Sequence, residues 1–116
     1  MTQKLILDAQ RAQLLANGRD AALNGDGSAF VPVVKFFTPD AAGKWLITEM
    51  MEDGDTLFGL CDLGHGTPEL GYVSLSELMT VRGRFGLPVE RDAHFTGKKS
   101  ISEYADTARR EGFIAA

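Results

Sequence analysis

The chain has 116 residues, of which 44% are hydrophobic and 24% are charged, and its formal net charge is −4. This balance is typical of one globular domain and excludes a disordered chain, while the acidity disfavours nucleic-acid binding through a concentrated basic patch. The single cysteine, Cys61, excludes an internal disulfide, and no segment approaches the roughly 20 apolar residues that span a bilayer, so we expect one cytoplasmic domain over residues 1–116 with no membrane segment.

An amphipathic helix is predicted over residues 3–17. Apolar residues recur there at intervals of four, three and four positions, which would place them on one face of a helix. These residues are Leu5, Ala9, Ala12 and Ala16. Asn17-Gly18 is the predicted end of the helix because both residues tolerate a positive φ, and NGDGS, residues 24–28, is predicted to be a loop.

Three runs rich in β-branched and aromatic residues follow, separated by clusters of turn-forming residues. They cover residues 31–37, 44–50 and 56–63. Asp53-Gly54 is the expected tip of the hairpin between the second run and the third. With GYVSL, residues 71–75, as a candidate fourth strand, the pattern predicts an antiparallel meander.

Two helix starts carry the signature of a capping box, in which a serine precedes a glutamate by three residues. The pairs are Ser74 with Glu77 and Ser100 with Glu103. In each pair the hydroxyl can accept from the backbone of the glutamate while the glutamate reaches back to the serine. We therefore predict a short helix after the fourth strand and a C-terminal helix over about 101–111.

The remaining segment, residues 87–95, is a candidate edge strand that starts at Pro88. The whole pattern predicts an α+β fold: an N-terminal helix, an antiparallel meander of four to five strands, a short capped helix and a C-terminal helix. Because edge strands invite pairing, residues 31–37 or 87–95 could join two copies of the chain in a homodimer.

Four ordered blocks of the sequence resemble the domain-of-unknown-function 2958 family, whose members are small bacterial proteins often encoded on plasmids, conjugative elements and phages. The resemblance runs from about Val33 to Phe95 and implies no particular activity. It does imply a setting among mobile genetic elements, where such proteins often bind host or defence factors. The blocks are VVKFFTP (33–39), LFGLCDLG (57–64), ELGYVSLSEL (69–78) and RGRFGLPVERD (82–92).

The candidate catalytic and metal-binding groups are incomplete. Asp92 and His94 would share one face of a strand, and Asp62 and His65 form a second carboxylate–imidazole pair, but neither pair has the spacing of a zinc site. Cys61 lies in an apolar run, which favours a structural thiol over a reactive one. We therefore predict no metal, no cofactor and no catalytic residue.

Large aromatic residues near turns, accompanied by arginines, are typical of protein interfaces. The predicted binding residues are Trp45, Tyr72, Arg82, Arg84, Phe85, Glu90, Arg91, Asp92 and His94. Two structural alternatives stand beside this interpretation. Trp45 and Phe85 could belong to the core, and Arg82 or Arg84 could pair with the carboxylates of Glu90 or Asp92 in a network that only holds a loop.

Three functions remain in competition. The leading hypothesis is a small non-catalytic module that binds another protein, in mobile-element biology or in counter-defence. The second is a hydrolytic or phosphate-ligand enzyme that uses Arg82, Arg84, Glu90, Asp92 and His94, and it requires these side chains to converge on one concave pocket. The third is a nucleic-acid-binding accessory protein. Its basic face would contain Arg82, Arg84, Lys98 and Lys99.

Overall fold

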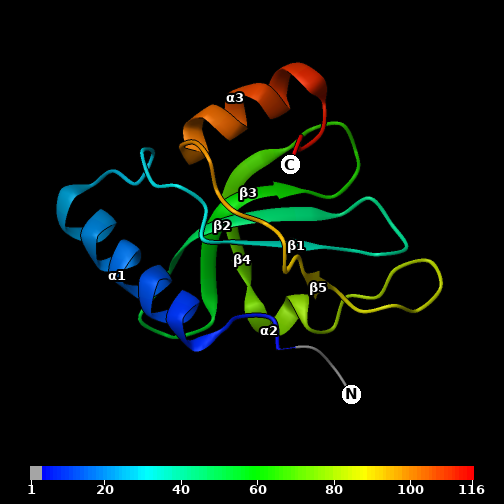
Figure 1. Ribbon diagram of the computed structural model, residues 1–116, viewed down its shortest axis with the longest axis horizontal. Helices are drawn as coiled ribbons and strands as arrows, with labels where there is room; N and C mark the ends of the chain where they lie inside the picture. Colours follow the sequence, from blue (N-terminus) through cyan, green and yellow to red (C-terminus); the bar gives the residue numbers. More distant parts are fainter. Residues whose placement is uncertain (1–3) are drawn as a thin grey trace.

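A computed structural model describes residues 4–116 of the chain, and the described residues form an α+β fold (Figure 1). The elements, in chain order, are α1 (Asp8–Asn24), β1 (Val34–Phe37), β2 (Lys44–Met50), β3 (Thr56–Asp62), β4 (Glu69–Ser74), α2 (Leu75–Leu78), β5 (Glu90–Arg91) and α3 (Ile101–Glu111).

The strands form one antiparallel sheet in the order β4-β3-β2-β1-β5. The first four strands follow one another as a meander, and β5 then pairs with the other side of β1. This arrangement confirms the α+β class and the antiparallel sheet. The expectation that residues 31–37 offer a free edge is wrong, because β1 lies between β2 and β5; the edge strands are β4 and β5.

One face of the sheet packs against α1, α2 and the segment that precedes α1 (Figure 1). Every second residue of a strand points to this face, so Val34 and Phe36 of β1 belong to it. The buried residues of this core are Leu5, Ile6, Leu14, Val34, Phe36, Trp45, Ile47, Met50, Leu57, Leu75, Leu78 and Val89.

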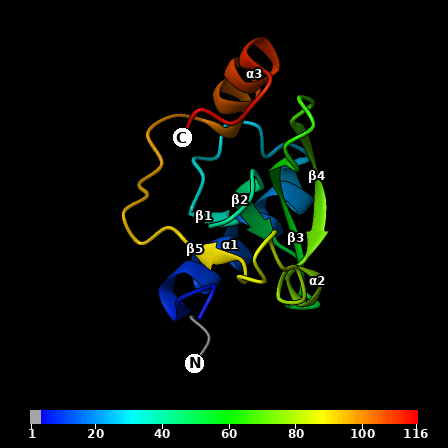
Figure 2. The same ribbon diagram turned by 90° about the vertical axis from the view of Figure 1, so that its right-hand side faces the viewer.

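The opposite face is covered by α3 and the segment that follows it. Leu46 packs on this side, whereas its neighbour Ile47 packs in the first core. In Figure 2 the connection between β5 and α3 arcs away from the sheet before α3 begins. The buried residues of this second core are Leu46, Leu60, Ile101, Tyr104, Ala105, Ala108 and Ile114.

The first helix differs from its prediction in both position and buried face. It begins at Asp8 and continues to Asn24, where Gly25 ends it with φ 74°. The predicted apolar stripe was wrong, since Ala9, Ala12 and Ala16 are exposed and the helix buries Leu14 and Gly18. Gly18 is therefore a packing residue: a Cβ at this position would lie 2.3 Å from the carbonyl oxygen of Met50. That close approach of helix to sheet requires a glycine.

The predicted serine caps are present at both later helices, but the reciprocal glutamate bond of the capping box is found only at α3, where the backbone N–H of Ser100 donates to Glu103 Oε1 at 3.4 Å. Ser74 Oγ accepts from the backbone N–H of Glu77 at 3.3 Å, and Ser100 Oγ accepts from that of Glu103 at 3.2 Å. The predicted long edge strand at 87–95 is shorter than expected, because only Glu90–Arg91 pairs with β1. In the part of the chain that the structure describes, no helix has the length and apolarity needed to cross a membrane.

Candidate functional site

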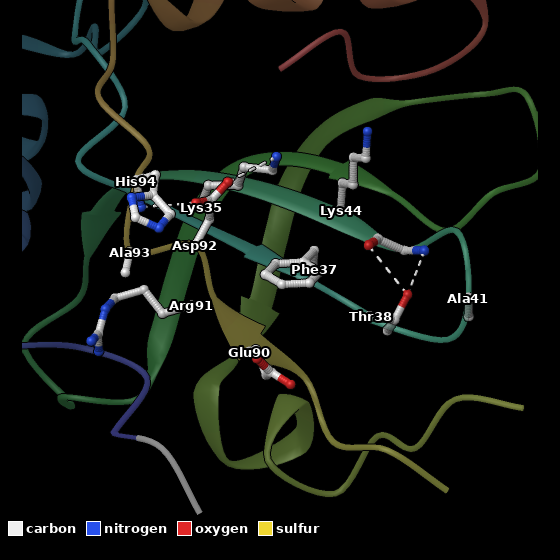
Figure 3. A pocket seen from close by; sticks show the side chains of 11 residues that line it. Lys35, Phe37, Thr38, Ala41, Lys44, Glu90, Arg91, Asp92, Ala93 and His94 are labelled. Atoms are coloured by element: carbon white, nitrogen blue, oxygen red, sulfur yellow. Dashed lines mark hydrogen bonds and ion pairs between the residues drawn. The ribbon is translucent and has the colours of Figure 1, made fainter. Parts of the chain in front are cut away.

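A pocket of about 520 Å³ lies on the α3 side of the sheet, where β1 and β5 run side by side (Figure 3). Its walls come from β1, the turn that joins β1 to β2, the start of β2 and the chain that follows β5. The lining residues are Lys35, Phe37, Thr38, Ala41, Gly43, Lys44, Glu90, Arg91, Asp92, Ala93 and His94.

The central charged pair of this pocket is Lys35 with Asp92. Lys35 Nζ lies 3.2 Å from Asp92 Oδ2 and donates at 2.7 Å to the carbonyl oxygen of Ala116. The backbone N–H of His94 donates to Asp92 Oδ1 at 2.9 Å, and this bond, with the nearby Lys35 ammonium, lowers the pKa of Asp92. Asp92 is therefore ionised at neutral pH, which makes it unsuited to act as a general acid.

The other polar groups of the pocket are also engaged or lie apart. Thr38 Oγ1 accepts from the backbone N–H of Gly43 at 2.8 Å, as Figure 3 shows, so this hydroxyl holds the turn. Lys44 Nζ donates to the carbonyl oxygen of Ile114 at 3.4 Å. Glu90 points away from Asp92 in the same view. Thr38 and Lys44 thus bind backbone, and none of the described contacts in the pocket pairs a nucleophile with a base.

Four of the predicted residues line this pocket: Glu90, Arg91, Asp92 and His94. The sequence had placed Asp92 on a strand face, but β5 ends at Arg91. The backbone N–H of Asp92 still donates to the carbonyl oxygen of Lys35 at 2.9 Å, after which the chain turns. The proximity of Asp92 to His94 thus comes from a turn.

The predicted arginines lie outside the pocket, on a small hairpin formed by residues 82–88. Arg82 and Pro88 form an antiparallel bridge at its base, and Arg82 Nη1 donates to the carbonyl oxygens of Met79 and Val81 at 3.0 and 2.8 Å. Among the described residues no ion pair joins Arg82 or Arg84 to Glu90 or Asp92. The predicted network was therefore wrong, and the partner of Asp92 is Lys35.

Asp40, in the turn after β1, holds this hairpin against the edge of the pocket. Asp40 Oδ2 accepts from the backbone N–H groups of Phe85 at 2.6 Å and Leu87 at 3.3 Å. A Cβ at Gly83 would overlap Asp40 Oδ1, and Gly86 has φ 83°, so both glycines are needed for the approach and the turn. The side chain of Phe85 is left 79% exposed. The alternative that Phe85 belongs to the core is thus wrong.

Two predicted aromatic anchors lie elsewhere. Trp45 is 3% exposed and belongs to the first core, so it is not available to a partner. Tyr72 is 68% exposed, but it lies on β4, at the opposite edge of the sheet from β5. The surface near the pocket therefore contains one exposed aromatic ring, that of Phe85, among the three predicted.

The remaining candidates have structural contacts. Asp62 is 2% exposed, and its carboxylate accepts from the backbone N–H groups of Gly64 at 2.8 Å and Ile114 at 3.0 Å. Burial raises the pKa of the Cys61 thiol to about 11, so it is protonated and weakly nucleophilic at neutral pH. Within residues 4–116, no group of three or more His, Cys, Asp or Glu side chains is arranged to hold a metal ion.

Sequence reasoning missed three residues that shape this site: Lys35, Lys44 and Asp40. Lys35 had a visible signal, because it is the one charged residue in the apolar run 31–37. A lysine inside a covered strand needs a counter-charge, and this requirement predicts an acid nearby. Asp40 had no comparable signal, since an acid after a proline is ordinary in a turn.

Comparison with known proteins gives a family and nothing more specific. No curated protein and no solved structure matches the chain. One family model matches residues 5–115, which extends well beyond the segment 33–95 on which the resemblance in the sequence rested. The chain belongs to the family described as "Protein of unknown function (DUF2958)".

Proposed function

We propose that this protein is a non-catalytic module that binds another protein through the hairpin 82–88 and the rim of the adjacent pocket. The observation that carries this proposal is the position of Phe85, which is 79% exposed at the tip of a hairpin held by backbone hydrogen bonds. Burying a phenylalanine side chain in a partner stabilises a complex by about 1.5–3 kcal/mol. A large exposed ring on a preformed loop meets the two main requirements of an interface anchor.

The surroundings of Phe85 support a mixed apolar and charged interface. Leu87, on the same hairpin, is 45% exposed, and Met79 just before it is 60% exposed. Beyond Asp40 the surface continues into the pocket with Glu90 and His94. An apolar centre with a polar rim of both charges is the usual composition of a non-obligate interface.

The family resemblance supplies the setting of the proposal. On that resemblance we propose that the protein acts in the biology of bacterial mobile genetic elements, in the cytoplasm, and that its partner is a host or defence factor. A second copy of the chain is a further partner to test, because β5 is an edge strand. Sedimentation of the purified protein would measure that self-association directly.

An affinity-capture experiment with matched variants tests the protein-binding proposal. Wild-type protein, Phe85→Ala and Phe113→Ala would be used as bait in a lysate of the host, since Phe113 is also exposed, at 51%, but lies after α3. We expect a reproducible partner that Phe113→Ala retains and that Phe85→Ala reduces at least tenfold. A partner captured equally by all three baits would refute the role of Phe85.

The enzyme hypothesis remains as a second candidate because Glu90, Asp92 and His94 line one pocket. Against it, Arg82 and Arg84 lie outside that pocket, and the low pKa of Asp92 leaves it without a proton to donate. A screen of phosphate esters and carboxylic esters would test it. Turnover that His94→Ala abolishes while the fold is retained would favour the enzyme over the binding module.

A further inference from the structure

A second pocket contains a largely buried glutamate whose side chain has no hydrogen-bond or ion-pair partner among the described residues. Glu49, on β2, is 6% exposed, and among the described residues its side chain makes no hydrogen bond and no ion pair. A buried charge is normally paired, because removal from water costs far more than one unsatisfied neutral group. The two other charged residues that are buried in the sheet, Lys35 and Asp62, both have partners. Glu49 therefore differs from both, and its missing partner could be supplied by a bound ligand.

Glu49 lines a pocket of about 380 Å³ between the end of α1, the start of α3 and the β4 side of the sheet. The sheet register places Glu49 opposite Phe58, and Phe58 opposite Tyr72, so the three side chains form one row across β2, β3 and β4. The rings of Phe58 and Tyr72 meet edge to face, with centroids 5.0 Å apart and an interplanar angle of 62°. The row thus offers a carboxylate and two aromatic rings to one cavity.

The loop after α1 lies close against the carboxylate of Glu49. A Cβ at Gly27 would lie 2.4 Å from Glu49 Oε2, so any larger residue at this position would push into the carboxylate. Tyr72 also lines the pocket and is 68% exposed, which leaves its ring accessible from solvent. A ligand can therefore reach the pocket past the ring of Tyr72.

The electrostatics of this pocket favour a cation. Its other charged side chain is Asp26, whose pKa is lowered by a hydrogen bond from the backbone N–H of Ser28, and none of its lining residues is a lysine, arginine or histidine. The C-terminal end of α1, which also lines the pocket, has no basic residue in its last turn. A helix C-terminus has a partial negative charge, so it attracts cations.

An anion is disfavoured even though α3 begins at this pocket. Helix N-termini attract anions through free backbone N–H groups. Here the N–H of Ile101 donates to the carbonyl oxygen of Phe30 at 2.8 Å, and the N–H of Ser102 donates to the carbonyl oxygen of Ser28 at 3.3 Å. The N–H of Glu103 is taken by Ser100 Oγ. These first donors of α3 are occupied, and an anion would also face Glu49.

We propose that this pocket binds an organic cation, namely the guanidinium or ammonium group of an arginine-like or lysine-like ligand. Glu49 neutralises the charge, and the rings of Tyr72 and Phe58 hold the alkyl chain and the face of the cation. Cations are attracted to aromatic faces, and a guanidinium also fits a carboxylate with two parallel hydrogen bonds. A volume of about 380 Å³ is within the range of small-ligand pockets. The site is distinct from the Phe85 surface and does not depend on the function proposed there.

Nuclear magnetic resonance titration with matched small molecules tests the proposal. The probes are Nα-acetyl-arginine amide and Nα-acetyl-lysine amide, and the control is Nα-acetyl-citrulline amide, which keeps the shape of arginine without the charge. We expect saturable shifts of the backbone signals of Gly27 and Tyr72 with the two cations. The citrulline compound should bind at least tenfold more weakly. Equal binding of arginine and citrulline compounds, or no saturable shift with either cation up to tens of millimolar, would overturn the proposal.

Variants separate the carboxylate from its surroundings. Glu49→Gln keeps the size of the side chain and should weaken binding of the cations at least tenfold, and Tyr72→Ala should weaken it several-fold. The control is Glu52→Gln, which removes an exposed carboxylate that pairs with Arg19 outside this pocket and should leave binding unchanged. Unchanged affinity in Glu49→Gln would refute the proposal.

A measurement on the wild-type protein does not require any variant to fold. Glu49, Asp26 and Tyr72 are the titratable side chains that line the pocket. Saturation with the arginine compound should lower the titration midpoint of the Glu49 carboxyl, followed by its carbon signal, and leave that of Glu52, which pairs with Arg19 outside the pocket, unchanged. A midpoint that does not move under saturation would contradict contact between the cation and Glu49. Comparing the free compound with a short arginine-containing peptide then distinguishes a small-molecule ligand from a basic side chain of a protein.

Discussion

Three charged residues buried in the sheet differ in how their charges are satisfied. Lys35 has Asp92 and the carbonyl oxygen of Ala116, and Asp62 has the backbone N–H groups of two loops. Glu49 has no such contact, and burial raises its pKa. Its ionised form therefore destabilises the free protein, which is the expected cost of a residue kept for a ligand.

The first prediction concerns the pH dependence caused by Glu49. A carboxyl whose pKa is raised on folding binds its proton more tightly in the folded state, so its stabilising effect is complete below its unfolded pKa of about 4.5 and is lost as pH rises through the folded pKa. Glu49→Gln removes that loss. We expect the variant to be more stable than wild type at pH 7–8 and nearly equal to it below pH 4, as measured by urea unfolding.

The control for this prediction is Glu69→Gln, which changes an exposed carboxyl on β4. At pH 7–8 the unfolding free energy of Glu69→Gln should lie within about 0.5 kcal/mol of that of wild type. A Glu49→Gln variant that is less stable than wild type at pH 8 would mean that the carboxylate has a stabilising partner.

At the scale of elements, the hairpin 82–88 is positioned by one side chain from a distant turn. Asp40 supplies acceptors for Phe85 and Leu87, and a residue with a Cβ in place of Gly83 would overlap this carboxylate. The orientation of Phe85 therefore depends on contacts made some 45 residues away along the chain. A preformed loop of this kind reduces the ordering cost of binding a partner.

Removal of Asp40 tests this arrangement. Asp40→Ala takes away the acceptor of two backbone N–H groups, and we expect the amide protons of Phe85 and Leu87 to exchange with solvent at least tenfold faster. The control is Asp26→Ala. It also removes a carboxylate that accepts from a backbone N–H group, that of Ser28, but outside the hairpin. Hydrogen exchange followed by NMR measures both, and unchanged protection of Phe85 in Asp40→Ala would contradict the anchoring role.

The packing of α1 on the sheet gives a third prediction. Gly18→Ala should destabilise the protein by about 1–3 kcal/mol, although alanine is the better helix former by about 1 kcal/mol, because the new Cβ would lie 2.3 Å from the carbonyl oxygen of Met50. Gly71→Ala is the matched control, since a Cβ there has no atom within 4 Å. Thermal unfolding should rank Gly18→Ala below wild type and Gly71→Ala close to it; the opposite order would show that the helix can shift freely.

Much of this element pattern could be predicted from sequence because local chemistry determines it. The bounds of β2 at Lys44–Met50 and the cap of α3 at Ser100 follow from strand-forming residues and a capping box. The extent of α1 could not, since Gly18 ends a helix or packs one depending on a strand that is distant in sequence. The ion pair of Asp92 was also not predictable, because its partner Lys35 is distant in sequence whereas the arginines considered as partners are near it.

At the scale of the whole molecule, the two faces of the sheet are closed in different ways. On the first face the sheet is covered by α1 with the segment before it, by α2 and by Val89, whereas the second face depends on α3 and on Ile114 beyond it. Two hydrogen bonds join the segment after α3 to the sheet. The backbone N–H of Ile114 donates to Asp62, and Lys35 donates to the backbone oxygen of Ala116. Each proposed binding site is next to a different part of this covering layer: the C-terminal segment contacts Lys35 of the first pocket, and the start of α3 lines the Glu49 pocket.

The last prediction tests whether Asp62 keeps α3 in place. Asp62→Ala leaves the buried N–H of Ile114 without its acceptor, which costs about 1–3 kcal/mol. Because Ile114 packs in the second core with Ala108 and Leu60, we expect the loss to spread to α3, with faster hydrogen exchange over residues 101–114 and little change at the centre of β2. Glu69→Ala, an exposed change on the neighbouring strand, should leave both regions as in wild type. If exchange increases equally in β2 and in α3, then the second core does not open separately from the rest, and the fold behaves as one cooperative unit in which Asp62 has no local role.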